Sequence, residues 1–189
     1  MRDLSYKLFE TAIGTCGIVW SARGVAGVQL PEADEDATRA RIRRRFVGVK
    51  EAPSSANIQC AIDGIAALLR GEKHDLSGVT IDDEGVPEFH KRVYAIARKI
   101  LPGLTITYGE IAELLGNKLL ARDVGQALGQ NPCPIIVPCH RVLAAGGKSG
   151  GFSASGGIVT KLRLLTIEGA QPGGPTLFER LPLLVRRRT

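Results

Sequence analysis

Cys139 lies between Pro138 and His140, so a thiol and an imidazole are neighbours in the chain. A cysteine attacks as its thiolate, and an imidazole close by can accept or relay the thiol proton. Because adjacent side chains rarely hydrogen-bond directly, we expect a water molecule to bridge the two groups. The imidazole needs a third group to orient it, and the Glu168 carboxylate is the best candidate downstream. These residues predict nucleophilic chemistry by a single thiol.

Prolines restrict the backbone around this thiol. The stretch NPCPIIVP (131–138) contains three of them, and each fixes one backbone angle and removes an amide donor. We expect IIV (135–137) to be a short, buried, extended segment, so that the thiol emerges from a rigid wall. The other cysteines, Cys16, Cys60 and Cys133, are expected to be small buried hydrophobic residues.

Two short helices are expected upstream of the thiol. Thr107 and Glu110 have the spacing of a capping box, which begins a helix over about 108–115. After a glycine-containing turn, a second helix covers about 119–130. This spacing is that of a helix-turn-helix motif, although two such helices can also simply pack in a core.

The second of these helices has a face of small residues. Ala121, Gly125 and Gly129 are four residues apart and share that face, with Arg122 beside them. Such a face allows the minor groove of DNA to approach the backbone closely. Close packing against another helix would use the same residues, so both interpretations stay open.

The N-terminal half has the pattern of a small α/β domain. Three β-prone segments over 6–30, separated by turn residues, indicate a β-meander. A helix is expected after Asp34 and another over 56–69, where apolar residues recur at helical spacing. The segment 77–82 could supply one more strand.

Composition and charge narrow the class of protein. The chain has 189 residues and a formal net charge of +6, which is compatible with binding to nucleic acid. The basic runs at 39–46 and at the C-terminal end can equally be solvated surface. No apolar run approaches the roughly 20 residues that span a membrane, and the first ten residues do not resemble a secretion signal. We therefore expect a cytoplasmic protein without membrane contact.

The cysteines and histidines do not have the spacing of a metal site. Four cysteines are spread thinly along the chain, which argues against a disulfide framework and for reduced thiols. No CxxC pair occurs, and there are only three histidines, so no metal ion is expected. A scattered zinc site built from Cys16, Cys60 and His74 stays open.

Three segments together resemble a known family. NPCPIIVPCHRV, with TYGEIA upstream and GGFSASGG and TKLRLLTIEGA downstream, is similar to the 6-O-alkylguanine-DNA alkyltransferases, also called methylated-DNA–protein-cysteine methyltransferases. The resemblance is strong over about 89–170, whereas in the first half only the order of elements agrees. It implies an α+β fold with two domains. Residues 1–86 would form an N-terminal α/β domain with a ribonuclease-H-like sheet, 87–172 a helical domain with a winged helix-turn-helix, and 173–189 a basic tail.

The resemblance also implies a reaction. Cys139 would take the alkyl group from the oxygen of 6-O-alkylguanine, or of 4-O-alkylthymine, once and irreversibly. His140 would draw off the thiol proton through a water molecule, and Glu168 would orient the imidazole. No cofactor is implied. The partner would be double-stranded DNA containing alkylated guanine, bound through its minor groove by a monomer.

Further roles follow for residues around the thiol. Tyr108 would help to rotate the target nucleotide and donate a hydrogen bond to the base, and Arg122 would fill the vacated stack. Asn131 would brace the turn between the recognition helix and the active-site loop. The carbonyl groups of Cys139 and Val142 would accept from the guanine amino group. These roles suit the physics, because chemistry on a base in a duplex requires the base to be flipped out.

This chain departs from the family at several positions. Where the family has Gly-Tyr-x-Gly-Gly, residues 151–157 read GFSASGG, so Ser153 or a neighbour would contact the guanine oxygen. Asp123 and Gln126 stand where the family's helix more often has small residues. Some members bind zinc in the first domain, and ligands for it are not recognisable in this sequence.

Two other functions have the same local features. Alkyltransferase-like proteins only bind lesions and lack the acceptor cysteine, so the presence of Cys139 argues against that function. A cysteine hydrolase would use a Cys/His pair but would not need a helix-turn-helix beside it.

Overall fold

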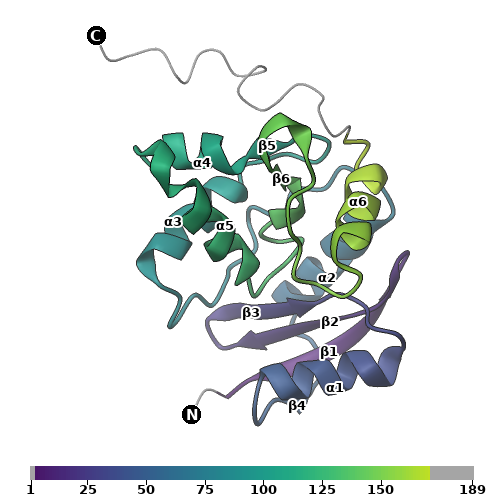
Figure 1. Ribbon diagram of the computed structural model, residues 1–189. Coiled ribbons are helices and arrows are strands. Elements are labelled where there is room, and N and C mark those ends of the chain that lie inside the picture. The colour runs from purple at the N-terminus through teal and green to yellow at the C-terminus, as the bar shows by residue number, and fades with distance from the viewer. Residues whose placement is uncertain (1–2, 171–189) are drawn as a thin grey trace.

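Three antiparallel strands form the sheet of the N-terminal half. They are β1 (Ser5–Thr11), β2 (Gly14–Ser21) and β3 (Gly24–Gln29), and a short β4 (Lys50–Glu51) pairs in parallel with β1. The strand order is β3-β2-β1-β4. The computed structural model describes residues 3–170 (Figure 1), so the basic tail at 173–189 lies outside the described residues. The expected β-meander is confirmed.

The possible strand over 77–82 does not form. Ile81 makes only an isolated bridge to Val25 of β3, where Val25 donates to the Thr80 carbonyl and accepts from the Asp82 amide. The Asp82 side chain accepts from the Ser21 hydroxyl. Farther along β3 the Val28 amide donates to the Pro132 carbonyl, so another segment occupies that part of the sheet edge and the pairing ends after one residue.

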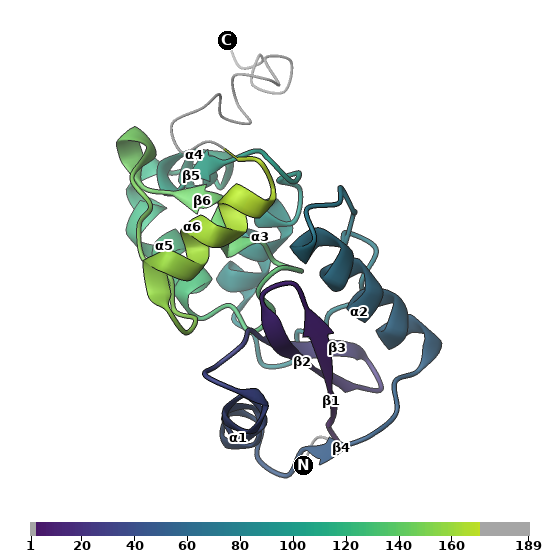
Figure 2. The same cartoon turned by 90° about the vertical axis from the view of Figure 1, so that its right-hand side faces the viewer.

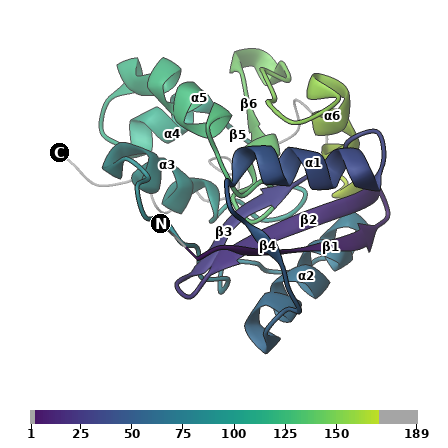
Figure 3. The ribbon, with the colours of Figure 1, turned by 90° about the horizontal axis from the view of Figure 1, so that it is seen from below.

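Two helices cover opposite faces of the sheet (Figure 3). α1 (Glu35–Arg45) begins at Asp34, whose side chain accepts from the Ala37 amide, and it packs through Ile42 on one face. α2 (Ala56–Leu69) covers the other face, and its bounds are those expected from the apolar periodicity. Phe46, directly after α1, packs in the same cluster as Ile42.

Four α-helices lie in the described C-terminal half. They are α3 (Glu88–Ala97), α4 (Tyr108–Leu114), α5 (Ala121–Gly129) and α6 (Gly157–Ile167). The capping box is present: Thr107 accepts from the Glu110 amide, and the Glu110 carboxylate accepts from the Thr107 amide. The start of the second expected helix is tighter than predicted, because 118–120 form a 3-10 turn before α5.

A single apolar core joins the two halves. It runs from sheet residues such as Val25 and Val28, through α2, to residues of α3, α5 and the segment around Cys139. At the sheet edge, the Val28 amide donates to the Pro132 carbonyl at 2.9 Å. Figure 2 shows α6 and the short strand β6 (Val142–Leu143) above this edge. The frame around the thiol is therefore tied directly to β3.

None of the helices in residues 3–170 is both long and apolar enough to cross a bilayer.

The contact between α1 and the sheet depends on Gly27. An added Cβ there would lie 2.3 Å from Cζ of the Phe46 ring, far inside van der Waals contact. We expect Gly27→Ala to lower the free energy of unfolding by about 1–3 kcal/mol, the usual cost of overpacking. Urea unfolding of both proteins measures this difference.

Gly78→Ala is the matched control, because a Cβ at Gly78 meets nothing within 4 Å. Equal unfolding midpoints for the two variants would show that the Phe46 ring moves aside without cost.

Candidate functional site

The thiol of Cys139 lies in a short 3-10 turn, Cys139–Arg141, between Pro138 and β6. The residue is buried, with 8% of its surface exposed, and Asn131 Nδ2 donates to its Sγ at 3.3 Å. Burial raises the pKa of the thiol, while the Asn131 hydrogen bond and the charge of Lys161 lower it. Burial has the larger effect, so the thiol needs a base to remove its proton.

A tight turn, rather than an extended segment, leads to the thiol. Ile135 has a φ of 73°, a left-handed conformation that is rare for a β-branched residue. The Val137 amide donates to the Cys133 carbonyl, and the Asn131 side chain closes the loop by bonding both the Cys133 amide and the Val137 carbonyl. The residues of IIV are buried as expected. The expectation that they are extended was wrong, because these internal bonds curl the chain.

His140 is completely buried and is oriented by a carboxylate. Its Nε2 lies 2.9 Å from Oε1 of Glu168 and donates to it, since an ionised carboxylate only accepts. Nδ1 is buried and makes no hydrogen bond to any residue in 3–170. Burial lowers the pKa of His140 below its ordinary value, although Glu168 raises it. A neutral imidazole with a free Nδ1 can accept a proton.

Glu168 also binds Arg141, a contact that the sequence did not suggest. Arg141 Nε and Nη2 each lie 2.8 Å from a Glu168 oxygen, and the guanidinium also donates to the Ile100 carbonyl. Burial would raise the pKa of Glu168, but His140 and Arg141 outweigh it and lower the pKa to about 2. The carboxylate is therefore charged at neutral pH and holds two side chains of the thiol turn.

Lys161 of α6 was not anticipated either. It is fully buried and its Nζ donates to the Val142 carbonyl at 2.6 Å. Burial lowers its pKa to about 8, and Cys139 opposes this shift. Lys161 is three, four and seven residues before Leu164, Leu165 and Glu168, so helical spacing places it on the buried face of α6. This spacing could have predicted its burial from the sequence.

The structure gathers most of the expected substrate residues around one cavity. This cavity has a volume of about 510 Å³ and is lined by Tyr108, Arg122, Gly125, Cys139 and Ser153, among others. At Gly129, which also lines it, an added Cβ would meet nothing within 4 Å. The small face of α5 therefore borders open space there and is not pressed against another helix.

Asn131 and Val142 do not line this cavity. Asn131 donates a hydrogen bond to the Cys139 sulfur and lines a second cavity that also reaches Cys139. Val142 is buried, and its carbonyl, expected to receive the guanine amino group, already accepts from Lys161. A carbonyl has two lone pairs, so one remains.

The remaining cysteines have other surroundings. Burial raises the pKa of Cys16 and of Cys133 to about 12. Cys60 was expected to be buried but is exposed, because it stands on the outer face of α2, away from Ile58 and Ile62.

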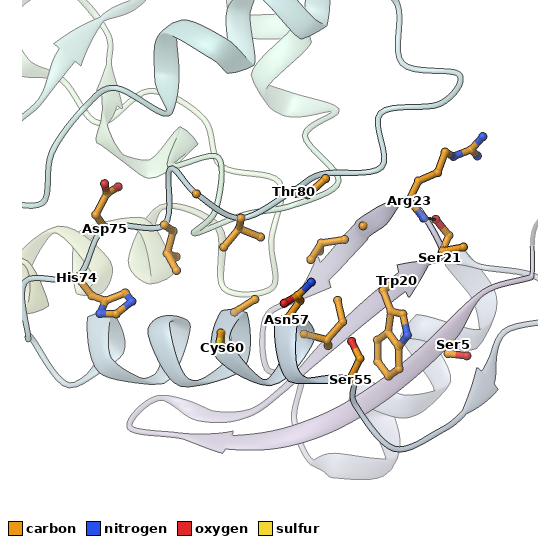
Figure 4. Close-up of a pocket in the computed structure, with 18 of the residues that line it drawn as sticks. Ser5, Trp20, Ser21, Arg23, Ser55, Asn57, Cys60, His74, Asp75 and Thr80 are labelled. Carbon is orange, nitrogen blue, oxygen red and sulfur yellow. Dashed lines mark hydrogen bonds between the residues drawn. The ribbon is translucent and has the colours of Figure 1, made fainter.

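A large groove of about 790 Å³ lies along α2, away from Cys139 (Figure 4). Cys60 and His74 line it, whereas Cys16 does not. Within residues 3–170, no group of three histidine, cysteine or acidic side chains could hold a metal ion. The scattered zinc set is therefore not brought together.

Removing the Glu168 charge should destabilise the folded protein. Glu168→Gln leaves Arg141 without its buried partner, and we expect a loss of about 3–5 kcal/mol at pH 7. The depressed pKa of Glu168 means that its stabilisation is complete above 4.5 and disappears as the pH falls towards about 2. The difference between variant and wild type should therefore shrink over that range, which urea titrations at several pH values measure.

Glu113→Gln is the control, since Glu113 forms an exposed pair with Lys118 at 2.5 Å. It should cost less than about 1 kcal/mol. A similar small loss for Glu168→Gln would mean that its buried contacts are not stabilising.

Comparison with known proteins agrees with this geometry. Residues 88–170 match the DNA-binding domain of the 6-O-methylguanine DNA methyltransferase family. A methylated-DNA–protein-cysteine methyltransferase of Methanothermobacter thermautotrophicus is 33% identical over 84% of this chain and 81% of the relative. The Mycobacterium tuberculosis protein of the same name is 41% identical over 67% of this chain and 75% of its own length.

Solved structures give the same result. The crystal structure of Mycobacterium tuberculosis OGT in complex with DNA has a TM-score of 0.69 and 32% identity, covering 87% of this chain and 92% of that one. The O6-methylguanine-DNA methyltransferase of Pyrococcus kodakaraensis has a TM-score of 0.68 and 30% identity, covering 88% and 99%. The mixed α/β fold described above matches these structures. The chain therefore belongs to the methylated-DNA–protein-cysteine methyltransferase family, and it repairs DNA by transferring alkyl groups to a cysteine of its own.

Proposed function

We propose that Cys139 is the acceptor and that it removes alkyl groups from 6-O-alkylguanine, and also from 4-O-alkylthymine, in double-stranded DNA. One observation supports this choice above the others. Among the described cysteines, Cys139 is the one whose side chain borders the cavity beside α5 and also belongs to the segment held by Glu168.

The reaction is a single displacement. The thiol proton passes through a water molecule to Nδ1 of His140, and Sγ attacks the alkyl carbon. A carbon–sulfur bond forms and the carbon–oxygen bond breaks, with its electron pair left on the guanine oxygen. Guanine gains a proton at its ring nitrogen, and His140 gives up the proton it took from the thiol, so the protons balance. The thioether is stable, so each protein molecule reacts once.

Neighbouring groups favour this displacement. The charge of Lys161 stabilises the thiolate, and the Asn131 amide donates to the same sulfur. Tyr108 is half-buried at the start of α4 and lines the larger cavity, where it donates to the guanine. Ser153 lines the same cavity and contacts the guanine oxygen. The remaining lone pair on the Val142 carbonyl and the carbonyl of Cys139 accept from the guanine amino group.

DNA is bound by the C-terminal half. In this proposal α4 and α5 are the helix-turn-helix of a winged domain over 87–172, and the N-terminal domain over 1–86 has a ribonuclease-H-like sheet. The small face of α5 enters the minor groove, and the exposed Arg122 replaces the flipped nucleotide in the stack. The protein acts as a cytoplasmic monomer.

Mass measurement of the intact protein tests the acceptor. After incubation with duplex DNA containing 6-O-methylguanine, we expect one methyl group per chain. Cys139→Ser should bind the same DNA but gain no methyl group, because a serine hydroxyl is far less ionised than a thiol.

Cys60→Ser is the matched control, since Cys60 is exposed and remote from α5. It should still take up one methyl group. Stoichiometric transfer to the Cys139→Ser protein would place the acceptor elsewhere.

Arg122→Ala tests base flipping. If Arg122 fills the gap left by the flipped base, its loss raises the free-energy cost of flipping by part of the few kcal/mol that unstacking takes. Repair of duplex DNA should then slow by about tenfold. Free 6-O-methylguanine needs no unstacking, so its reaction should keep its rate. Single-turnover rates at one fixed salt concentration measure both.

Lys118→Ala removes a neighbouring exposed charge and is the control for general electrostatic attraction. Equal slowing of Arg122→Ala on duplex and free base would contradict a role in flipping.

A further inference from the structure

A second cavity also reaches Cys139, and part of its wall comes from the N-terminal half. Its volume is about 260 Å³, and it shares Gly129, Cys139, Phe152 and Ser153 with the larger cavity. Otherwise the two walls differ. The larger cavity has Tyr108 and residues of α5, whereas the smaller one has the end of β3 and two arginines of α1.

The smaller cavity has an excess of positive charge. Its charged lining residues are Arg41, Arg45 and Glu32, which leaves one positive charge uncompensated. Arg45 is held in place, because its Nη1 donates to Gln29 Oε1 at 2.8 Å and to the Val28 carbonyl at 3.3 Å.

The Arg41 guanidinium has fewer hydrogen-bond partners than that of Arg45. Its Nε lies 3.9 Å from Glu32 Oε1, and its guanidinium makes no hydrogen bond to residues in the described part of the chain. That Glu32 oxygen also accepts from Gln29 Nε2 at 3.1 Å. The Arg41 side chain is 42% exposed. A guanidinium with free donors therefore borders the space next to the thiol.

The two arginines repel each other. The pKa of Arg45 is lowered first by burial and then by the charge of Arg41, and Glu32 offsets this only in part. An anion between the two guanidinium groups would relieve the repulsion and accept their hydrogen bonds. Other polar side chains line the same space: Gln29, Gln130, Ser153 and Ser155. Apolar residues such as Val28, Leu30 and Phe152 line the rest of the cavity.

We propose, on the basis of the function proposed above, that this cavity receives alkyl groups ending in a carboxylate, such as a carboxymethyl group on the guanine oxygen. Arg41 would then make the protein prefer such lesions to neutral lesions of the same size. A carboxylate adds only three heavy atoms to a methyl group. A water molecule occupies about 30 Å³ in the liquid, so a cavity of about 260 Å³ has room for this addition.

The geometry of the displacement supports this assignment. The sulfur, the attacked carbon and the leaving oxygen lie in line, so any further substituent on that carbon points sideways. With the base in the larger cavity, the smaller cavity is the space that such a substituent can enter beside Cys139.

The atoms balance as in methyl transfer. Sγ forms a bond to the CH₂ carbon, and the bond from that carbon to the guanine oxygen breaks with its electron pair on oxygen. The thiol loses one proton and guanine gains one. The carboxylate is unchanged, and the product is S-carboxymethylcysteine at position 139.

Three duplexes that differ only in the lesion test the proposal. They contain 6-O-carboxymethylguanine, its neutral amide analogue 6-O-carbamoylmethylguanine, and 6-O-methylguanine. We expect the wild-type single-turnover rate to be higher for the carboxymethyl lesion than for the amide. Arg41→Gln should lower the ratio of these two rates by roughly five- to tenfold, the effect of one partly buried charge pair. Arg41→Lys should keep most of the ratio.

The ratio of two lesions of equal shape cancels effects on folding and on DNA affinity. Arg44→Gln removes one charge from an exposed position of α1 that does not line the cavity, and it should leave the ratio unchanged. The inference is overturned by an Arg41→Gln ratio equal to that of the wild type, or by an equal change in Arg44→Gln. Failure of the wild type to react with any of the three lesions would instead overturn the proposed function.

Discussion

The buried carboxylate of Glu168 fixes the relation between α6 and the segment that contains the thiol. An ionised carboxylate is costly to bury unless it is paired and hydrogen-bonded. Here it meets His140 and the fork of Arg141, which come from the same 3-10 turn as Cys139. The turn cannot shift without leaving a buried charge uncompensated, and the imidazole must present its other nitrogen away from Glu168.

The thiol is held rigidly at a cost to its reactivity. Burial in an apolar wall raises the pKa of Cys139, so neighbouring groups must favour the thiolate. Asn131 does so with one hydrogen bond and Lys161 with its charge. The left-handed backbone at Ile135 is the strained part of this frame, and it is kept because its surroundings bond the turn closed. A protein that reacts once gains selectivity from such fixed geometry.

Much of the fold follows from local patterns in the sequence. The bounds of α2 are those of its apolar periodicity, and the capping box at Thr107 marks the start of α4, because both depend on residues within a few positions of each other. The pairing of His140 with Glu168 could also be predicted, since a base next to a thiol needs a carboxylate to orient it. The position of Cys139 in its motif already indicated the chemistry.

Only the tertiary structure decided which further residues from distant parts of the chain join the site. IIV (135–137) curls because Asn131 bonds across it, and this competition between side chain and backbone has no signal in apolar periodicity. Lys161 is buried because α6 turns that face towards Val142. Arg41 belongs to a basic run that is compatible with plain solvated surface, and it reaches the cavity at Cys139 because α1 packs on the face of the sheet over β2 and β3. Sequence determines such local propensities, whereas the packing of elements far apart in the chain determines which charges meet.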